Sequence, residues 1–309
     1  MTFARKKEPP ASLHLLVHPE QDSEYRHFEV ALADGSFAQA VRALPFDTAA
    51  TTFSPINAWW LADAALLAYW DQAEATKRFK SDAGLNSTFF SRNGTQCYVA
   101  SNDQFVVVAF RGTQPNDRAD VWTDADFVPR PWERGGQAHE GFIRGLNVVW
   151  ADLLTELKAM DGKGVWFTGH SLGAALAVLA ADRFGSPAGV YTIGSPRVGD
   201  SAFAAGFNGR HAGRSFRYVN YHDVVTHVPP SDFGFCHVDA EKHFDETGVL
   251  QGRAASGQGV IDGASKFFAG LPKLVSGASL MPRALIDHTP RRYTTCIWNA
   301  FVASDSVRT

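Results

Sequence analysis

The sequence predicts an α/β protein with a mostly parallel central sheet, and three observations support this fold class. Short apolar runs that suit strands alternate along the chain with segments of helical periodicity, the pattern of consecutive βαβ units. Residues 105–110 are continuously apolar, as in a strand that is covered on both faces. The 309 residues, 45% of them apolar, are enough to bury about three quarters of the unfolded surface. Since no internal repeat or linker is visible, we expect one domain over residues 1–309.

The expected elements can be placed along the chain from their apolar spacing. Residues 1–12 are expected to form a loose leader. Apolar residues at steps of three and four predict a helix over about 54–70 and a longer one over about 139–160. Strands at 96–101 and 104–110 are expected to form a hairpin that turns at Asn102-Asp103. We further expect strands at 165–168, 189–193 and 216–221, and helices at 171–183, 200–207 and 290–302.

Charge and cysteine content exclude several classes of protein. The net charge of −3 gives no attraction to nucleic acid, so we expect no nucleic-acid partner. The three cysteines, Cys97, Cys236 and Cys296, are too few and too scattered for a disulfide framework or a zinc site, and we expect them to be reduced. Glu8 and two prolines follow the basic N-terminus where the apolar core of a signal peptide should begin. We therefore expect a cytoplasmic protein, or one exported without a leader.

Residues 169–173 read Gly-His-Ser-Leu-Gly and form a G-x-S-x-G motif around Ser171. A buried strand is predicted before this motif and an alanine-rich helix after it, which is the context of a nucleophilic serine on a sharp strand-to-helix turn. The residues two positions before and after the serine must be small, because strand and helix approach closely there. Free N–H groups at the start of the helix would favour an oxyanion. The alternative interpretation is a serine that only caps the helix.

A serine hydroxyl needs a base and a carboxylate that orients this base. Asp223 follows a predicted strand and lies where such a carboxylate belongs, whereas Asp200 is better placed as a helix cap. The histidines that follow Asp223 are His227, His237, His243 and His288. The residues alone favour His288, on a loop before the last helix, and leave His243 as the second candidate.

Five motifs occur together in register, at residues 107–113, 139–142, 169–173, 194–200 and 220–230. In this order they resemble the class 3, fungal-type triacylglycerol lipases of the α/β-hydrolase fold. The resemblance implies a catalytic triad of Ser171, Asp223 and His288. Around His288 the sequence departs from the family pattern Asp-His-x-x-Tyr, because Arg291 occupies the tyrosine position and Tyr293 follows His288 by five residues.

The resemblance also implies an oxyanion hole and a lid. The hole would use the backbone N–H groups of Thr113 and Leu172, and Leu172 is expected there on geometric grounds too. Residues 114–122 would form a short lid. This stretch is polar apart from Val121 and Trp122, so we expect weak interfacial activation and activity on dissolved short-chain esters. A helical insertion at 248–286, before the catalytic histidine, would form a cap. Our candidates for substrate binding are His170, Trp122, Phe267 and Phe268.

The alternative for the inserted segment is a pair of amphipathic helices, divided at Pro272, that pack on the core. If it is a cap, Phe267 and Phe268 would line an acyl channel or touch a lipid surface.

The function expected from these residues is that of a serine hydrolase, most simply a triacylglycerol lipase or esterase that forms an acyl-enzyme on Ser171. The substrate would be an acylglycerol or another ester, with transient contact to a lipid surface, and the reaction requires no cofactor and no metal. Within the same chemistry, the alternatives are a phospholipase A1 or galactolipase, and a feruloyl or simple carboxylesterase. From a different class, the alternative is a non-catalytic, hydrolase-like protein that binds lipid.

Overall fold

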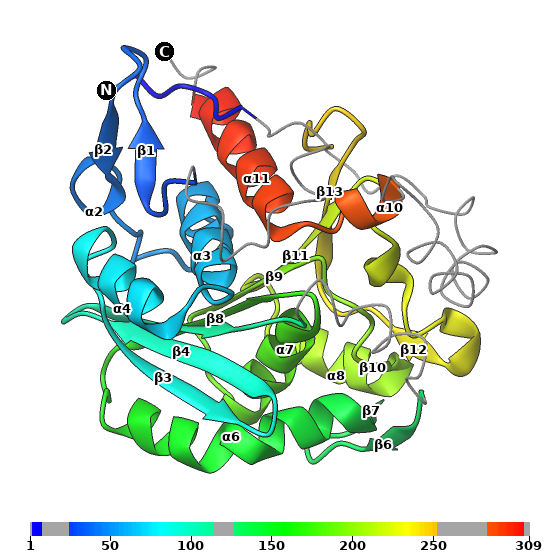
Figure 1. Cartoon of the computed structure of the whole chain (residues 1–309). Helices are drawn as coiled ribbons and strands as arrows, with labels where there is room; N and C mark the ends of the chain where they lie inside the picture. The colour runs from blue at the N-terminus through cyan, green and yellow to red at the C-terminus, as the bar shows by residue number, and fades with distance from the viewer. Residues whose placement is uncertain (1, 8–24, 114–126, 252–282, 306–309) are drawn as a thin grey trace.

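A seven-stranded sheet runs through the computed structural model, which describes residues 2–7, 25–113, 127–251 and 283–305 (Figure 1). The spatial order of the strands is β13-β11-β9-β8-β5-β4-β3. Their bounds are β3 Asn86–Arg92, β4 Thr95–Ser101, β5 Phe105–Phe110, β8 Gly164–His170, β9 Gly189–Ile193, β11 Ser215–Asn220 and β13 Ala240–Phe244. The strands from β5 to β13 pair in parallel, whereas β3, β4 and β5 form an antiparallel meander. The mostly parallel sheet is thereby confirmed.

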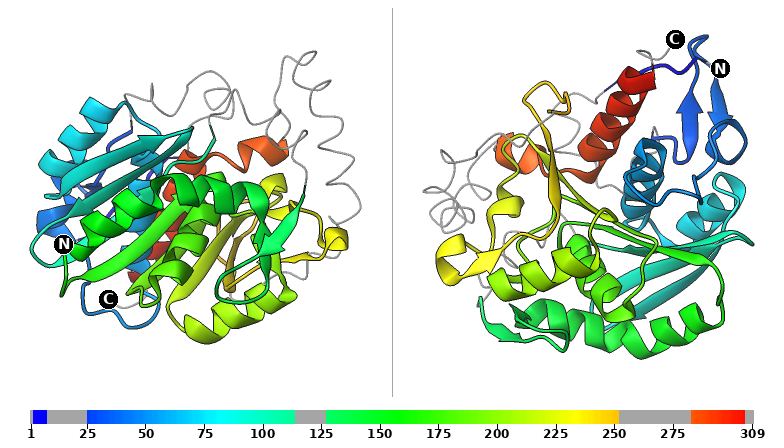
Figure 2. Two further views of the ribbon diagram at one scale, coloured as in Figure 1. Left: turned by 90° about the horizontal axis from the view of Figure 1, so that it is seen from below. Right: turned by 180° about the vertical axis from the view of Figure 1, so that it is seen from behind.

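Two helical layers cover the sheet (Figure 2). On one face lie α3 (Pro55–Leu67) and α11 (Pro290–Asp305), and on the other α6 (Glu140–Lys158), α7 (Leu172–Phe184) and α8 (Ser201–Arg210). Strand β5 shows the division, because Val107 and Ala109 belong to the first apolar core while Val106 and Val108 belong to the second. Neighbouring strand residues point to opposite faces, so a continuously apolar strand fills both cores.

Both long helices form where the apolar spacing predicted them, but only α6 has its buried residues along one side. Helix α6 buries Phe142, Leu146, Val149, Leu153 and Leu157 along one stripe. Nearly all of α3 is buried instead, and it begins where the hydroxyl of Ser54 accepts the N–H of Asn57. Both helices thus receive most of their stability from tertiary packing.

The first residues of the chain are not the loose leader that we expected. Segment 2–7 lies against α11, where the N–H of Lys6 donates to Asn299 Oδ1 at 2.9 Å and the indole of Trp298 donates to the carbonyl of Ala4 at 2.9 Å. The Lys6 ammonium lies 5.5 Å from the centre of a Trp298 ring, and burial lowers its pKa to about 8. These hydrogen bonds use main-chain groups of segment 2–7, which the residue types there do not reveal.

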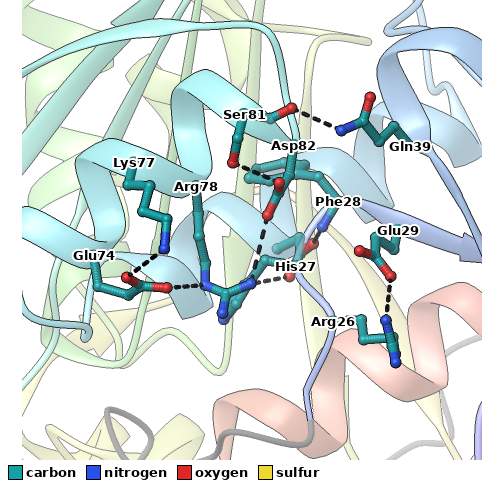
Figure 3. Close-up of polar contacts among 11 residues, drawn as sticks. Arg26, His27, Phe28, Glu29, Gln39, Glu74, Lys77, Arg78, Ser81 and Asp82 are labelled. Atoms are coloured by element: carbon teal, nitrogen blue, oxygen red, sulfur yellow. Dashed lines mark hydrogen bonds and ion pairs between the residues drawn. The ribbon is translucent and has the colours of Figure 1, made fainter.

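The N-terminal part of the chain adds a hairpin and two helices beside α3. They are β1 (Glu29–Ala31), β2 (Phe37–Gln39), α2 (Ala40–Ala43) and α4 (Gln72–Ser81). Figure 3 shows how this hairpin meets α4: the amide of Gln39 donates to the main-chain carbonyl of Ser81 at 2.9 Å. Next to this contact, Arg78 pairs with Glu74 at 2.9 Å and with Asp82 at 3.5 Å. These three side chains are half-buried, and each pair joins residues one helical turn apart.

A second, four-stranded sheet lies beside the carboxyl end of the main one, with strand order β12-β10-β7-β6. Its strands are short: β6 (Pro129–Pro131), β7 (Gln137–His139), β10 (Gly199–Asp200) and β12 (Phe235–Cys236). The short helical turns η3 (Val224–His227), η4 (Ser231–Phe233) and α10 (Arg283–Ile286) complete the described elements. The three cysteines are free thiols. Among the described helices, none is long and apolar enough to span a bilayer.

Candidate active site

Ser171 lies at a sharp turn between β8 and α7. Its backbone has φ 60° and ψ −131°, a strained conformation for a residue with a side chain, and α7 begins at the next residue. A methyl group at Gly169 would lie 2.3 Å from the main chain of Gly173, and one at Gly173 would lie 2.3 Å from the carbonyl oxygen of Phe110. The two glycines of the motif are therefore required by close approach, as the sequence predicted.

Three side chains from distant segments meet at this turn. The hydroxyl of Ser171 lies 2.9 Å from His288 Nε2, and His288 Nδ1 lies 2.8 Å from Asp223 Oδ2. All three residues are fully buried. A carboxylate only accepts hydrogen bonds, so Nδ1 carries the proton and Nε2 is left to accept the proton of the serine hydroxyl. This is the geometry of a nucleophile, its base and an orienting carboxylate.

Among the described residues, three groups donate hydrogen bonds to the carboxylate of Asp223. Besides His288, the N–H of Val225 donates to Oδ1 at 2.9 Å and the hydroxyl of Tyr293 donates to Oδ2 at 2.6 Å. A buried charge that is fully hydrogen-bonded pays little of the penalty for leaving water. Asp223 is thereby held as an anion next to the imidazole.

Tyr293 is the residue of this site that sequence reasoning missed. Its hydroxyl accepts the N–H of Asn220 at 2.9 Å while it donates to Asp223. Burial, and then the negative charge of Asp223, raise the pKa of Tyr293 well above its ordinary value, so the hydroxyl stays protonated. The only signal in the sequence was a tyrosine two residues beyond its usual place in the family pattern. The first turns of α11 bring its hydroxyl to the carboxylate all the same.

We predict that Tyr293→Phe lowers kcat on a soluble ester about tenfold with little change in KM, because it removes one charge-assisted hydrogen bond from Asp223. Tyr191→Phe is the matched control. Tyr191 is also a buried tyrosine whose hydroxyl accepts a main-chain N–H, that of Ser54 at 3.0 Å, but it lies away from the three side chains. Equal losses of kcat in the two variants would show that Tyr293 acts only through stability.

His170 corrects our expectation of a substrate-binding role. Its Nε2 donates to the main-chain carbonyl of His288 at 2.7 Å, and its Nδ1 accepts the hydroxyl of Tyr69 at 2.8 Å. Both ring nitrogens are thus engaged inside the protein, and the side chain is fully buried. His170 supports the loop that carries His288 and has no free nitrogen to offer a substrate.

The two residues expected in the oxyanion hole flank Ser171. Thr113 follows β5 by three residues and Leu172 opens α7, where the first N–H groups have no partner within the helix. Between β5 and Thr113, a methyl group at Gly112 would lie 2.1 Å from the hydroxyl of Tyr69 and 3.1 Å from Ser171 Cβ. Only a glycine allows the chain to pass this close to the serine, and Thr113 is the next residue of the chain.

The other histidine candidates lie elsewhere. His237 donates through Nε2 to the carbonyl of Thr226 at 2.7 Å, and burial lowers its pKa well below the ordinary value. His243 lies in β13 and contacts Glu241 at 3.0 Å. His227 ends η3, and burial lowers its pKa as well. Of the four histidines, the structure brings His288 to Ser171.

Several predicted site residues fall outside the described part of the chain. These are Trp122, Phe267 and Phe268, together with the lid at 114–122 and most of the cap at 248–286. At the described end of the cap, Arg283 on α10 pairs with Asp287 at 2.8 Å, directly before His288. Burial raises the pKa of Asp287, partly offset by Arg283.

Comparison with known proteins identifies this arrangement. Residues 107–233 match the family model described as Lipase (class 3), a stretch that includes Thr113, Ser171 and Asp223. Over this stretch the chain is similar to the class 3 lipase family. A lipase of Rhizomucor miehei is 33% identical over 198 residues, which cover 56% of this chain and 51% of that protein. The secreted mono- and diacylglycerol lipase A of Penicillium camembertii is 36% identical over 183 residues, 55% and 57% of the two chains.

Solved structures of this family share the α/β-hydrolase fold with the chain. Lipase II from Rhizopus niveus superposes with a TM-score of 0.52 and 26% identity over 62% of this chain and 82% of its own. A triacylglycerol lipase described as having a serine protease triad as its catalytic centre gives a TM-score of 0.51 and 27% identity, over 66% of this chain and 79% of its own. The chain spans about half the length of the curated relatives it matches.

Proposed function

We propose that this protein is a class 3 lipase that hydrolyses carboxylic esters, most simply acylglycerols, through an acyl-enzyme on Ser171. The observation that carries the proposal is the pair of contacts at His288, 2.9 Å to the serine hydroxyl and 2.8 Å to Asp223. A buried, oriented base next to a serine on a strained turn makes the hydroxyl nucleophilic.

The reaction proceeds in two halves. Ser171 Oγ attacks the ester carbonyl carbon while His288 Nε2 takes the hydroxyl proton. The tetrahedral oxyanion that forms accepts hydrogen bonds from the main-chain N–H groups of Thr113 and Leu172. When this intermediate collapses, the ester C–O bond breaks and Nε2 gives its proton to the departing alcohol. Water then attacks the acyl-enzyme with His288 as base, which releases the acid and restores Ser171. Throughout, Asp223 stabilises the imidazolium, and Tyr293 and Val225 hold Asp223.

The choice of acylglycerols draws on the relatives, which are named lipases and mono- and diacylglycerol lipases. A substrate series tests it directly. Purified protein is assayed against mono-, di- and triacylglycerols, a phosphatidylcholine, a galactolipid and a feruloyl ester, all with matched short chains where the chemistry permits. We expect the highest kcat/KM on an acylglycerol. Preference for the phospholipid or galactolipid would make the protein a phospholipase A1 or galactolipase, and preference for the feruloyl ester an esterase. No turnover of any ester would favour a protein that only binds lipid.

A further inference from the structure

A cavity of about 700 Å³ opens beside the two expected oxyanion donors. Thr113 and Leu172 form one wall, the turn between β3 and β4 forms another, and one side of α6 forms the third. Gly112, which also lines this cavity, lies next to Ser171, because a methyl group at Gly112 would lie 3.1 Å from Ser171 Cβ. A substrate whose carbonyl oxygen faces Thr113 and Leu172 would therefore extend into the cavity.

The described lining of the cavity carries positive charge. Among the described residues that line it are the two arginines Arg111 and Arg144, and none of these residues is an aspartate or glutamate. Arg111 is committed elsewhere, because it donates to the side chain of Gln96 and stands over the ring of Tyr69. Arg144 lies exposed on α6, and among the described residues it has no hydrogen-bond or ion-pair partner. The acid one turn before it, Glu140, pairs with Arg130 at 3.3 Å.

We propose that this cavity binds an anionic group of the ester substrate, a carboxylate or a phosphate, through the guanidinium of Arg144. An arginine without a protein partner presents a planar fork of donors that matches a carboxylate or phosphate in two parallel hydrogen bonds. The hydroxyl of Thr95 and the amide of Asn93 line the same cavity and add polar groups around such an anion. This inference rests on the proposed ester hydrolysis and adds a preference for charged substrates over neutral ones.

The test compares pairs of esters that differ by one charged group. The acyl chain of 4-nitrophenyl hexanoate ends in a methyl group, whereas that of the 4-nitrophenyl monoester of adipic acid ends in a carboxylate. Dihexanoylglycerol and dihexanoylphosphatidic acid differ by a phosphate at the alcohol end. For each pair we measure the ratio of kcat/KM for the charged ester to that for the neutral one. The pair whose ratio changes when Arg144 is replaced shows which end of the substrate carries the anionic group.

We expect Arg144→Gln to lower this ratio about tenfold in at least one pair, since one exposed charged hydrogen-bond partner is lost. Arg144→Lys should keep the ratio within about threefold of wild type, because the charge remains. Rising salt should lower the wild-type ratio. Arg214→Gln is the matched control: Arg214 is also exposed but lies before β11, at the amino end of the parallel strands, away from the cavity. A ratio that Arg144→Gln leaves unchanged in both pairs would overturn the proposal.

A binding measurement separates this inference from the proposed function. Titration calorimetry follows sn-glycerol 3-phosphate binding to wild type and to Arg144→Gln. If no ester is turned over, the proposed function fails, and binding that depends on Arg144 still supports the cavity. If neutral esters are hydrolysed but glycerol phosphate does not bind and the ratios do not respond to Arg144, the cavity assignment is wrong while the function stands.

Discussion

Replacing Ser171 by alanine is expected to lower kcat for ester hydrolysis about 10⁶-fold, because the atom that forms the acyl-enzyme is gone. The measurement is steady-state hydrolysis of a soluble 4-nitrophenyl ester. Mass spectrometry of protein treated with a fluorophosphonate probe gives a second readout: wild type should gain one adduct, and Ser171→Ala none. Because Ser171 and His288 act as one unit, the double variant Ser171→Ala/His288→Ala should be no slower than the single one.

Ser195→Ala serves as the matched control for the nucleophile. Ser195 is a buried serine after β9 that donates to the carbonyl of Pro196, and it has no place in the proposed mechanism. The variant Ser195→Ala should be labelled by the probe at the wild-type rate. Labelling of Ser171→Ala, or activity of that variant above about one hundredth of wild type, would disprove the assignment of the nucleophile.

Asp223→Asn is expected to lower kcat about 10⁴-fold, since it removes the charge that stabilises the imidazolium and disturbs the tautomer of His288. Three donors converge on this carboxylate, from His288, Tyr293 and Val225. An amide has one oxygen, so in either orientation its NH₂ group faces a donor. The proton on His288 is then drawn toward Nε2, where it blocks acceptance of the serine proton. kcat on the soluble ester and thermal unfolding are measured together.

Asp200→Asn is the control for this change. Asp200 caps α8 by accepting the N–H of Phe203 at 2.8 Å, so its replacement should change stability by about 1 kcal/mol or less and leave kcat near wild type. If Asp223→Asn kept more than about a tenth of the wild-type kcat, Asp223 would not be the residue that orients the base.

The elements that the sequence predicted well are those whose pattern is set locally. The stripe of α6, the continuously apolar strand β5 and the hairpin turn at Asn102 all follow from the local order of apolar and polar residues. The edge strands β3 and β13 were missed. Strand β13 reads Ala-Glu-Lys-His-Phe and has only one buried residue, because an edge strand is partly exposed and needs no apolar run. The four short strands of the second sheet carry no periodicity at all.

Part of the candidate site could likewise be predicted from the sequence, and part could not. The strained turn at Ser171 and the two glycines around it could be predicted, because close approach of a strand and the next helix restricts residues only two positions apart. The choice among four histidines needed either the family resemblance or the structure. His288 lies 117 residues from Ser171 and 65 from Asp223 along the chain.

The amino-acid sequence alone established an α/β protein with a serine on a strand-to-helix turn and a carboxylate after a later strand. The three-dimensional arrangement added the roles of Tyr293 and His170 and the charged cavity at Arg144. Local steric rules act between neighbours and leave a trace in residue type. Hydrogen bonds and cavities between α11, the loop before it and the carboxyl ends of the strands arise only when the sheet brings distant segments together.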